Sequence, residues 1–188
     1  KRFMPHFHIP LQSGSNKVLR LMQRRYLRDV YQSRVEKIKS VMPHACIGVD
    51  VIVGFPGETN EDFLETYNFV RELDVSYFHV FTYSERASTK AAEMEGIVPV
   101  PIRNERNAAL RGLSEKKKRF FYEQHLNTAR TALMEQEQHG EVMHGFTDNY
   151  IKVTMPFNTE AVNNLVEVQL STIDTEGNVI ALQLEESN

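Results

Sequence analysis

The chain has 188 residues, of which 41% are hydrophobic and 25% charged, and its formal net charge is −3 at neutral pH. This composition is ordinary for a globular protein, and the length suits one medium domain or a domain with a small module. The total charge gives no argument for nucleic-acid binding, so any phosphate contact must come from clustered Lys and Arg. No apolar run approaches the roughly 20 residues that span a bilayer. A single cysteine leaves no intrachain disulfide to form, which favours a cytoplasmic protein.

The first predicted unit is a short strand at Phe7–Ile9, followed by the loop Pro10–Asn16 and a short helix. Ser15 or Asn16 is placed to cap this helix. The loop residues expected to contact a ligand are Gln12, Ser13 and Gly14. Together with the free amides at the start of the helix, they predict a polar nest suited to hydroxyls or a carboxylate.

The second unit carries the most informative segment of the chain. A helix capped by Asp29 leads to a buried strand, Cys46–Val53, which stops at Gly54. The next helix is expected to begin at Thr59, with Asp62 three residues on in a box-like arrangement. Glycines at the carboxyl end of a strand let the backbone approach a ligand closely, and that end is where α/β sheets and barrels bind ligands.

One face of this strand is predicted to take part in binding. Alternation places Asp50, Ile52 and Gly54 on the same side. A carboxylate in an apolar strand is costly unless it is paired. Asp50 therefore either binds a ribose hydroxyl or an ammonium group of a ligand, or forms a salt bridge to a neighbouring strand.

The third unit is an apolar strand, Ser76–Thr82, which is followed by Tyr83 and Arg86. Guanidinium binds oxyanions bidentately, so Arg86 is expected to contact a phosphate or a carboxylate of a ligand. Strands that alternate with helices predict a parallel sheet. Three loops of this kind at one edge of a sheet predict a single shared site.

After the third unit the sequence pattern changes from alternating strands and helices to one long helix followed by short β-rich runs. A breaker-rich loop leads to a long polar helix, from Ile102 to about Asn127, whose Lys116–Arg119 run is either a solvated face or an RNA-facing patch. Beyond it, short β-rich runs alternate with turns: Thr131–Glu135, Gly140–Met143, Asn149–Met155, Leu165–Ile173 and Val179–Leu184. These runs predict a small five-stranded antiparallel barrel of the oligonucleotide-binding kind.

Three segments together resemble one enzyme family. They are His8–Ser15, Asp50–Thr59 and His79–Arg86, the last continued by Thr89 and Ala91–Met94. They are similar to the radical S-adenosylmethionine methylthiotransferases, which add a methylthio group to adenosine 37 of tRNA or, in one branch, to a ribosomal protein. The third segment most resembles the branch that acts on N6-threonylcarbamoyladenosine. Ser88 departs from that branch, which has glycine before the threonine.

The resemblance implies S-adenosyl-L-methionine as cofactor, bound by Gln12, Ser13, Gly14, Asp50, Ile52, Gly54 and Tyr83. Family members also hold two [4Fe–4S] clusters on cysteine triplets, and one cluster cleaves the cofactor to a 5′-deoxyadenosyl radical. This chain has only Cys46, which we expect to be a small core residue. It is therefore read as the carboxyl-terminal part of a longer enzyme, with no catalytic residue of its own and no activity alone.

The β-rich tail is expected to bind RNA. The stretch Gly145–Val153 resembles the TRAM domain, a barrel appended to many tRNA-modifying enzymes. Tyr150 would stack on a base and Lys152 would meet a phosphate, or both would lie on an exposed strand face with a cross-strand aromatic pair. The expected organisation is α/β plus small all-β: the second half of an open (β/α)6 partial TIM barrel at 1–100, a connecting helix at 101–128 and a TRAM-like barrel at 129–188.

The expected function is therefore part of a methylthiotransferase that modifies N6-threonylcarbamoyladenosine in tRNA, with no membrane association. The alternatives are a stand-alone RNA-binding module and a methylthiotransferase for isopentenyladenosine tRNA or a ribosomal protein. No metal site is expected, because His6 and His8 lack a third ligand at suitable spacing. An unpaired sheet edge predicts that the isolated chain self-associates.

Overall fold

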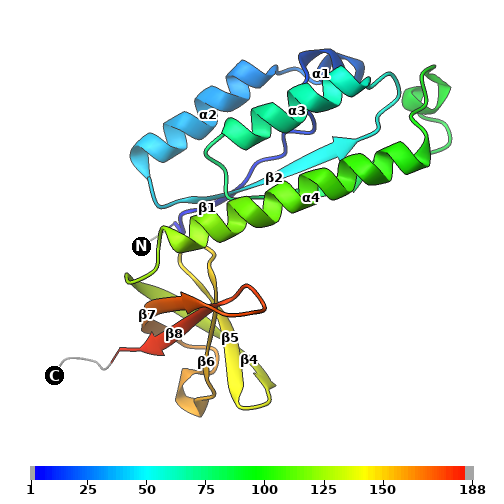
Figure 1. Ribbon diagram of the computed structural model, residues 1–188. Coiled ribbons are helices and arrows are strands. Elements are labelled where there is room, and N and C mark those ends of the chain that lie inside the picture. The colour runs from blue at the N-terminus through cyan, green and yellow to red at the C-terminus, as the bar shows by residue number, and fades with distance from the viewer. Residues whose placement is uncertain (1–2, 185–188) are drawn as a thin grey trace. The chain divides into compact units, whose positions relative to one another are not determined.

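The computed structural model describes residues 3–184, which form two compact units (Figure 1). The βα unit contains residues 7–43 and 47–117, and the barrel unit contains the segment ending at His6, residues 44–46 and the chain from Lys118 onward. The boundary divides a helix that the sequence suggested would only connect the two domains. Within the described residues, no helix is long and apolar enough to cross a membrane.

The βα unit is built on a three-stranded sheet in the order β1 (His6–His8), β2 (Cys46–Val53) and β3 (Tyr77–Thr82). Strands β2 and β3 are parallel, and Asp50 lies opposite His79. The loop after β1 continues the pairing, because Gln12 forms a parallel bridge with Val51. The parallel sheet predicted from the alternation of strands and helices is confirmed.

Four helices accompany the sheet: α1 (Asn16–Leu21), α2 (Arg28–Val41), α3 (Asn60–Glu72) and α4 (Val100–Glu123). The odd-numbered residues of β2, from Ile47 to Val53, are fully buried against helix side chains. Their helix partners in the core are Tyr31, Val35, Phe63, Val70, Leu110 and Leu113. The even-numbered residues of β2 therefore face the other side of the sheet.

The start of α2 differs from the expectation that Asp29 caps it. The N-cap is Leu27, which offers no side-chain bond, and Asp29 lies inside the first turn. The cap comes instead from the preceding helix, because Asn16 Oδ1 accepts the Arg28 amide at 3.0 Å. Local spacing did not reveal this cap, because its donor and acceptor are 12 residues apart.

The start of α3 confirms the capping box. The Thr59 hydroxyl accepts the Asp62 amide, and the Asp62 carboxylate accepts the Thr59 amide at 2.9 Å. Asp62 also ties α3 to α1, since Ser15 Oγ donates to it at 3.0 Å and Lys17 Nζ at 2.6 Å. Ser15 occupies the N-cap position of α1, but its hydroxyl bonds Asp62 and makes no capping hydrogen bond.

We expect Asp62→Asn to reduce the acid sensitivity of the βα unit. Burial raises the pKa of Asp62, but the bonds from Lys17, Thr59 and Ser15 outweigh it and hold this pKa below its usual value. The carboxylate therefore stabilises the fold above its unfolded pKa of about 4, and that stability is lost as the pH falls through the lower folded pKa. Denaturant unfolding between pH 2 and 7 should show a shallower pH slope for the variant; an unchanged slope would contradict this reading.

The barrel unit contains five strands: β4 (Ala129–His139), β5 (Val142–Thr147), β6 (Lys152–Pro156), β7 (Leu165–Ile173) and β8 (Val179–Gln183). They close into a barrel in the order β4-β5-β6-β8-β7. The predicted small barrel is therefore present. It differs in one pairing, because β6 and β8 run parallel while the other neighbours are antiparallel.

Candidate functional site

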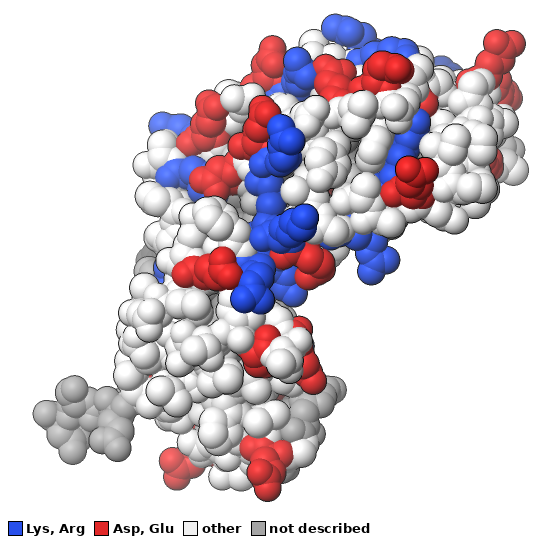
Figure 2. Space-filling view, viewed as in Figure 1, with Lys and Arg blue, Asp and Glu red and all other residues white. Residues whose placement is uncertain are grey.

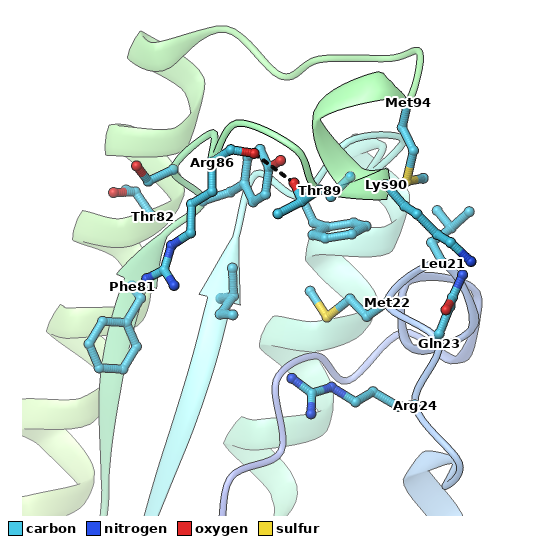
Figure 3. A pocket seen from close by; sticks show the side chains of 15 residues that line it. Leu21, Met22, Gln23, Arg24, Phe81, Thr82, Arg86, Thr89, Lys90 and Met94 are labelled. Atoms are coloured by element: carbon cyan, nitrogen blue, oxygen red, sulfur yellow. Dashed lines mark hydrogen bonds between the residues drawn. The ribbon is translucent and has the colours of Figure 1, made fainter.

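A cavity of about 640 Å³ lies at the carboxyl ends of β2 and β3 in the βα unit (Figure 3). Its walls come from the end of α1, the turn after β2 and the loop after β3. The lining includes Met22, Arg24, Ile52, Phe55, Phe81, Tyr83, Arg86, Lys90 and Met94. The volume is within the range of small-molecule and cofactor sites, and the position is the ligand-binding end of a parallel sheet.

The cavity combines apolar walls with a basic rim. Ile52, Phe55 and the two methionines provide surfaces on which a flat heterocycle can pack. Arg24, Arg86 and Lys90 come from the loop after α1 and the segment after β3, and no Asp or Glu is among the lining residues. In Figure 3 the Arg86 guanidinium reaches down beside Phe81. The arrangement suits a ligand with an aromatic part and an anionic part.

Tyr83 leaves an unused hydrogen-bonding group at the cavity wall. Its ring packs edge-on against Phe55, with centroids 5.3 Å apart, and the Arg103 guanidinium lies 5.4 Å from its centroid. Its hydroxyl is buried and finds no partner within residues 3–184. Because buried hydroxyls in native proteins are normally bonded, this one fits a polar atom of a ligand.

Arg103, from α4, holds the loop that follows β3. Its side chain donates to Tyr83 O at 2.8 Å, to Glu85 at 2.5 Å and to Val98 O at 2.7 Å. Gly54 makes room for it, because a Cβ at this position would lie 2.3 Å from Arg103 Cγ. Gly54 also has φ +77°, a conformation that favours glycine. Gly54 thus leaves space for the Arg103 side chain and also shapes the edge of the cavity.

A buried ion pair between Glu58 and Arg106 stabilises the turn that begins at Gly54. Glu58 accepts the Gly54 amide at 2.9 Å and Arg106 Nη1 at 2.5 Å, and both charged residues are 6% exposed. Burial raises the pKa of Glu58, and the bonds from Gly54 and Arg106 oppose that rise. Local sequence spacing does not indicate this role, because Arg106 lies 48 residues away along the chain.

Among the residues predicted to bind the cofactor, Ile52 and Tyr83 line the cavity, as does Arg86. Gln12 lies beside Ile52, whose amide donates to Gln12 O, and has the strained φ of +75°. Ser13 and Gly14 face α3 instead. Their polar groups bond the Thr66 hydroxyl, and a Cβ at Gly14 would lie 2.8 Å from Thr66 Cα. The proposed nest is therefore mostly occupied by the protein itself.

Asp50 lies on the same face of β2 as Ile52 and precedes it by two residues. Its carboxylate contacts His8 Nε2 at 2.9 Å. The sequence allowed two roles for Asp50, ligand binding or a salt bridge to a neighbouring strand, and this contact corresponds to the second. The partner is on β1, and ligand binding by Asp50 stays a prediction.

Ser88, which stands where the resembled branch has glycine, adopts a conformation that glycine favours. Its φ is +64°, in the left-handed region where a residue without Cβ is favoured. A glycine at this position would adopt the same conformation without strain, so serine carries a small energetic cost here.

In the barrel unit, both faces of the Tyr150 ring are covered. The His6 ring stacks on it at 3.9 Å and the Phe146 ring at 4.8 Å. The sequence alternative of a cross-strand pair on an exposed strand face does not describe this residue, because Tyr150 lies between β5 and β6 with φ +66°. A base could stack on Tyr150 only after displacing one of these rings. Lys152 is half-buried on β6.

The Lys116–Arg119 run on α4 is partly used within the protein. Lys117 Nζ donates to Leu73 O at 2.5 Å, and burial lowers the pKa of this lysine. Lys118 lies 5.6 Å from the Tyr122 ring centroid, and Arg119 pairs with Glu123. Lys117 therefore fits neither a solvated face nor an RNA-facing patch, and for the rest of the run both interpretations stay predictions.

The distribution of charge along the chain is the signal that the sequence analysis missed. From Ala129 to the end there are two basic residues, Arg130 and Lys152, against ten acidic ones. Arg130 is already paired with Asp148 at 3.2 Å. Figure 2 shows Lys and Arg mixed with acidic residues over the helices, and acidic residues alone over the visible part of the barrel. Phosphate contacts are therefore favoured in the βα unit.

Comparison with known proteins agrees with the fold. The radical SAM superfamily pattern matches residues 1–70. Over 90% of its length the chain is 40% identical to a threonylcarbamoyladenosine tRNA methylthiotransferase of Bacillus subtilis, and over 81% it is 42% identical to one of Aquifex aeolicus. A tRNA-2-methylthio-N(6)-dimethylallyladenosine synthase of Bacillus pumilus is 37% identical over 92% of the chain.

The chain therefore belongs to the radical SAM tRNA methylthiotransferase family. It spans 38%, 36% and 34% of the lengths of these three relatives. The single cysteine of the sequence, Cys46, is 1% exposed within β2. One buried thiol does not fit an iron–sulfur cluster, which needs about four ligands.

Proposed function

We propose that the protein acts in a methylthiotransferase that adds a methylthio group to C2 of N6-threonylcarbamoyladenosine 37 in tRNA. The cavity at the ends of β2 and β3 carries the proposal, because it joins apolar walls to a basic rim. Relatives named for threonylcarbamoyladenosine are 40% and 42% identical over 90% and 81% of the chain, whereas dimethylallyladenosine synthases are 37% identical over 92% of it and 47% identical over 60%. The threonyl carboxylate of that nucleoside is an anion that the rim suits.

S-adenosyl-L-methionine fits the inner part of the cavity. Ile52 and Phe55 would support the adenine, and the unpaired Tyr83 hydroxyl would bond one of its polar atoms. Asp50 and Gln12 remain candidates for the ribose or methionine part. When bound, the cofactor supplies a radical and a methyl group. The residues of this chain orient it and cover it.

We assign tRNA binding to the βα unit rather than to the barrel. Arg24, Arg86 and Lys90 are among the residues that line the cavity, whereas the acidic barrel repels a phosphate backbone. The alternative of a stand-alone RNA-binding module loses support for the same reason. Tyr150 and Lys152 stay secondary candidates for RNA contact. A tRNA-modifying role places the protein in the cytoplasm.

Nucleoside analysis of tRNA tests the assignment. In cells that lack the gene containing this sequence, mass spectrometry should show N6-threonylcarbamoyladenosine without its methylthio group. Loss of the methylthio group from isopentenyladenosine instead would overturn the substrate assignment. Unchanged tRNA methylthiolation would overturn the function.

Arg86→Ala in the complete enzyme is expected to lower kcat/KM for tRNA by about 10- to 100-fold, because a hydrogen bond to a charged group contributes about 1.5–3 kcal/mol. The loss should appear mainly in KM for tRNA, while KM for S-adenosyl-L-methionine stays the same. Arg34→Ala, at an exposed position on α2, is the matched control. Equal effects of the two variants would remove Arg86 from the site.

A further inference from the structure

Three potential metal ligands meet on the open face of the βα sheet. They are His8 on β1, Asp50 on β2 and His79 on β3, and one ligand atom from each lies within 4.8 Å of the others. His8 Nε2 and Asp50 Oδ1 are 2.9 Å apart, and the His8 and His79 rings are 5.4 Å apart. Local spacing does not reveal this set, because its members are separated by 42 and 29 positions and only the sheet brings them together.

Neighbouring strands hold these side chains in place. Asp50 and His79 are direct partners in the β2–β3 register, and the Leu11 amide, three residues after His8, bonds Asp50 O. Below them the Tyr77 ring packs edge-on against His79 at 5.2 Å. Gly48 gives that ring its space, since a Cβ there would lie 2.4 Å from Tyr77 Cζ. Ligands on adjacent strands are more precisely placed than ligands on loops.

The pairing of His8 with Asp50 does not account for the third member. Within the part of the chain that the structure describes, the His79 ring contacts the rings of His8 and Tyr77 and makes no side-chain hydrogen bond. Its imidazole is exposed beside a carboxylate that is 22% exposed. An ion pair needs one histidine, whereas a metal ion uses two.

We propose that His8, Asp50 and His79 bind a divalent transition-metal ion of the zinc class. Two imidazoles and one carboxylate are ligands that such ions prefer, and three protein ligands leave a further position for water or another ligand. Metal–ligand bonds of about 2.0–2.2 Å give a tetrahedron with an edge of about 3.3–3.6 Å, so His8 Nε2 and Asp50 Oδ1, which are 2.9 Å apart, would separate by about half an ångström around the ion. A small closure of His79 towards them completes the set.

This site lies at the floor of the cavity and is distinct from its lining. Ile52 and Phe81 line the cavity, and they follow Asp50 and His79 by two residues on the same face. Two residues along a strand correspond to about 7 Å. The ion would join three strands beneath the cavity and direct its open position along the sheet face. The proposal does not depend on the tRNA-modifying function.

Titration of the 188-residue chain with Zn²⁺ tests the site. Calorimetry should show one Zn²⁺ bound per chain, and Asp50→Asn and His79→Gln should each weaken binding at least tenfold. His144→Gln is the matched control, since this histidine lies on β5 and bonds Thr154. Circular dichroism and thermal unfolding confirm that each variant is folded. Binding that Asp50→Asn and His79→Gln leave unchanged would overturn the proposal.

A second readout needs no variant. Zn²⁺ should shift the imidazole nitrogen resonances of His8 and His79 together in NMR spectra of the unmodified chain, and leave those of His144 in place. Co²⁺ should give the intense visible absorption of a four- or five-coordinate ion. Zn²⁺ that shifts neither His8 nor His79, or that binds only at other histidines, would refute the site.

Discussion

Replacing Glu58 with alanine should lower the free energy of unfolding of the βα unit by about 3–5 kcal/mol, because it leaves a buried arginine without its counter-charge. Arg106 is 6% exposed, and its Nε already lacks a partner within the described residues. The change also removes the acceptor of the Gly54 amide. Denaturant unfolding followed by far-ultraviolet circular dichroism measures the loss.

Two comparisons make this prediction specific. Glu123→Ala removes an ion pair with Arg119 whose side chains are both largely exposed, so it should change stability by less than about 1 kcal/mol. The double change Glu58→Leu with Arg106→Met removes both buried charges and should restore most of the lost stability. If Glu58→Ala cost no more than Glu123→Ala, the pair would not be buried as the structure has it.

Gly54→Ala should destabilise the βα unit by about 2–4 kcal/mol and disturb the cavity. Alanine in the left-handed conformation costs about 1 kcal/mol, and a Cβ 2.3 Å from Arg103 Cγ adds an overpacking cost of about 1–3 kcal/mol. Arg103 can yield only by giving up its bonds to the loop after β3. We therefore expect weaker cofactor binding in the complete enzyme as well as a lower unfolding midpoint.

Gly112→Ala is the control for this change. Gly112 lies within α4, and a Cβ there would meet nothing within 4 Å. Because glycine is unfavourable inside a helix, this substitution should stabilise the protein by about 0.5–1 kcal/mol. If both glycine variants shifted stability in the same direction, neither the strain nor the close contact at Gly54 would explain the result.

Much of the fold was readable from local patterns. The strand Cys46–Val53 was predicted with its observed bounds, and the capping box of Thr59 and Asp62 is present. Helix bounds were less accurate, because α4 begins at Val100 and takes Pro101 into its first turn, where proline costs no hydrogen bond. The parallel pairing of β6 with β8 was missed because it joins segments that no hairpin connects.

The candidate site was only partly predictable. Ile52, Tyr83 and Arg86 were placed correctly at one cavity by strand alternation and strand ends. Ser13 and Gly14 carry the same kind of local signal, but they face α3. Which side of a loop meets a ligand and which meets a helix depends on how the helix packs, and no spacing in the loop encodes that.

The sequence alone determined the alternation of strands and helices, the apolar face of β2 and the family to which the chain is similar, because these depend on neighbours a few positions apart. Only the tertiary structure decided that Arg106 neutralises Glu58, that Arg103 occupies the space at Gly54 and that His8, Asp50 and His79 face one another. Those contacts join residues between 29 and 71 positions apart, and their energies come from burial and close approach, which exist only after the chain has packed.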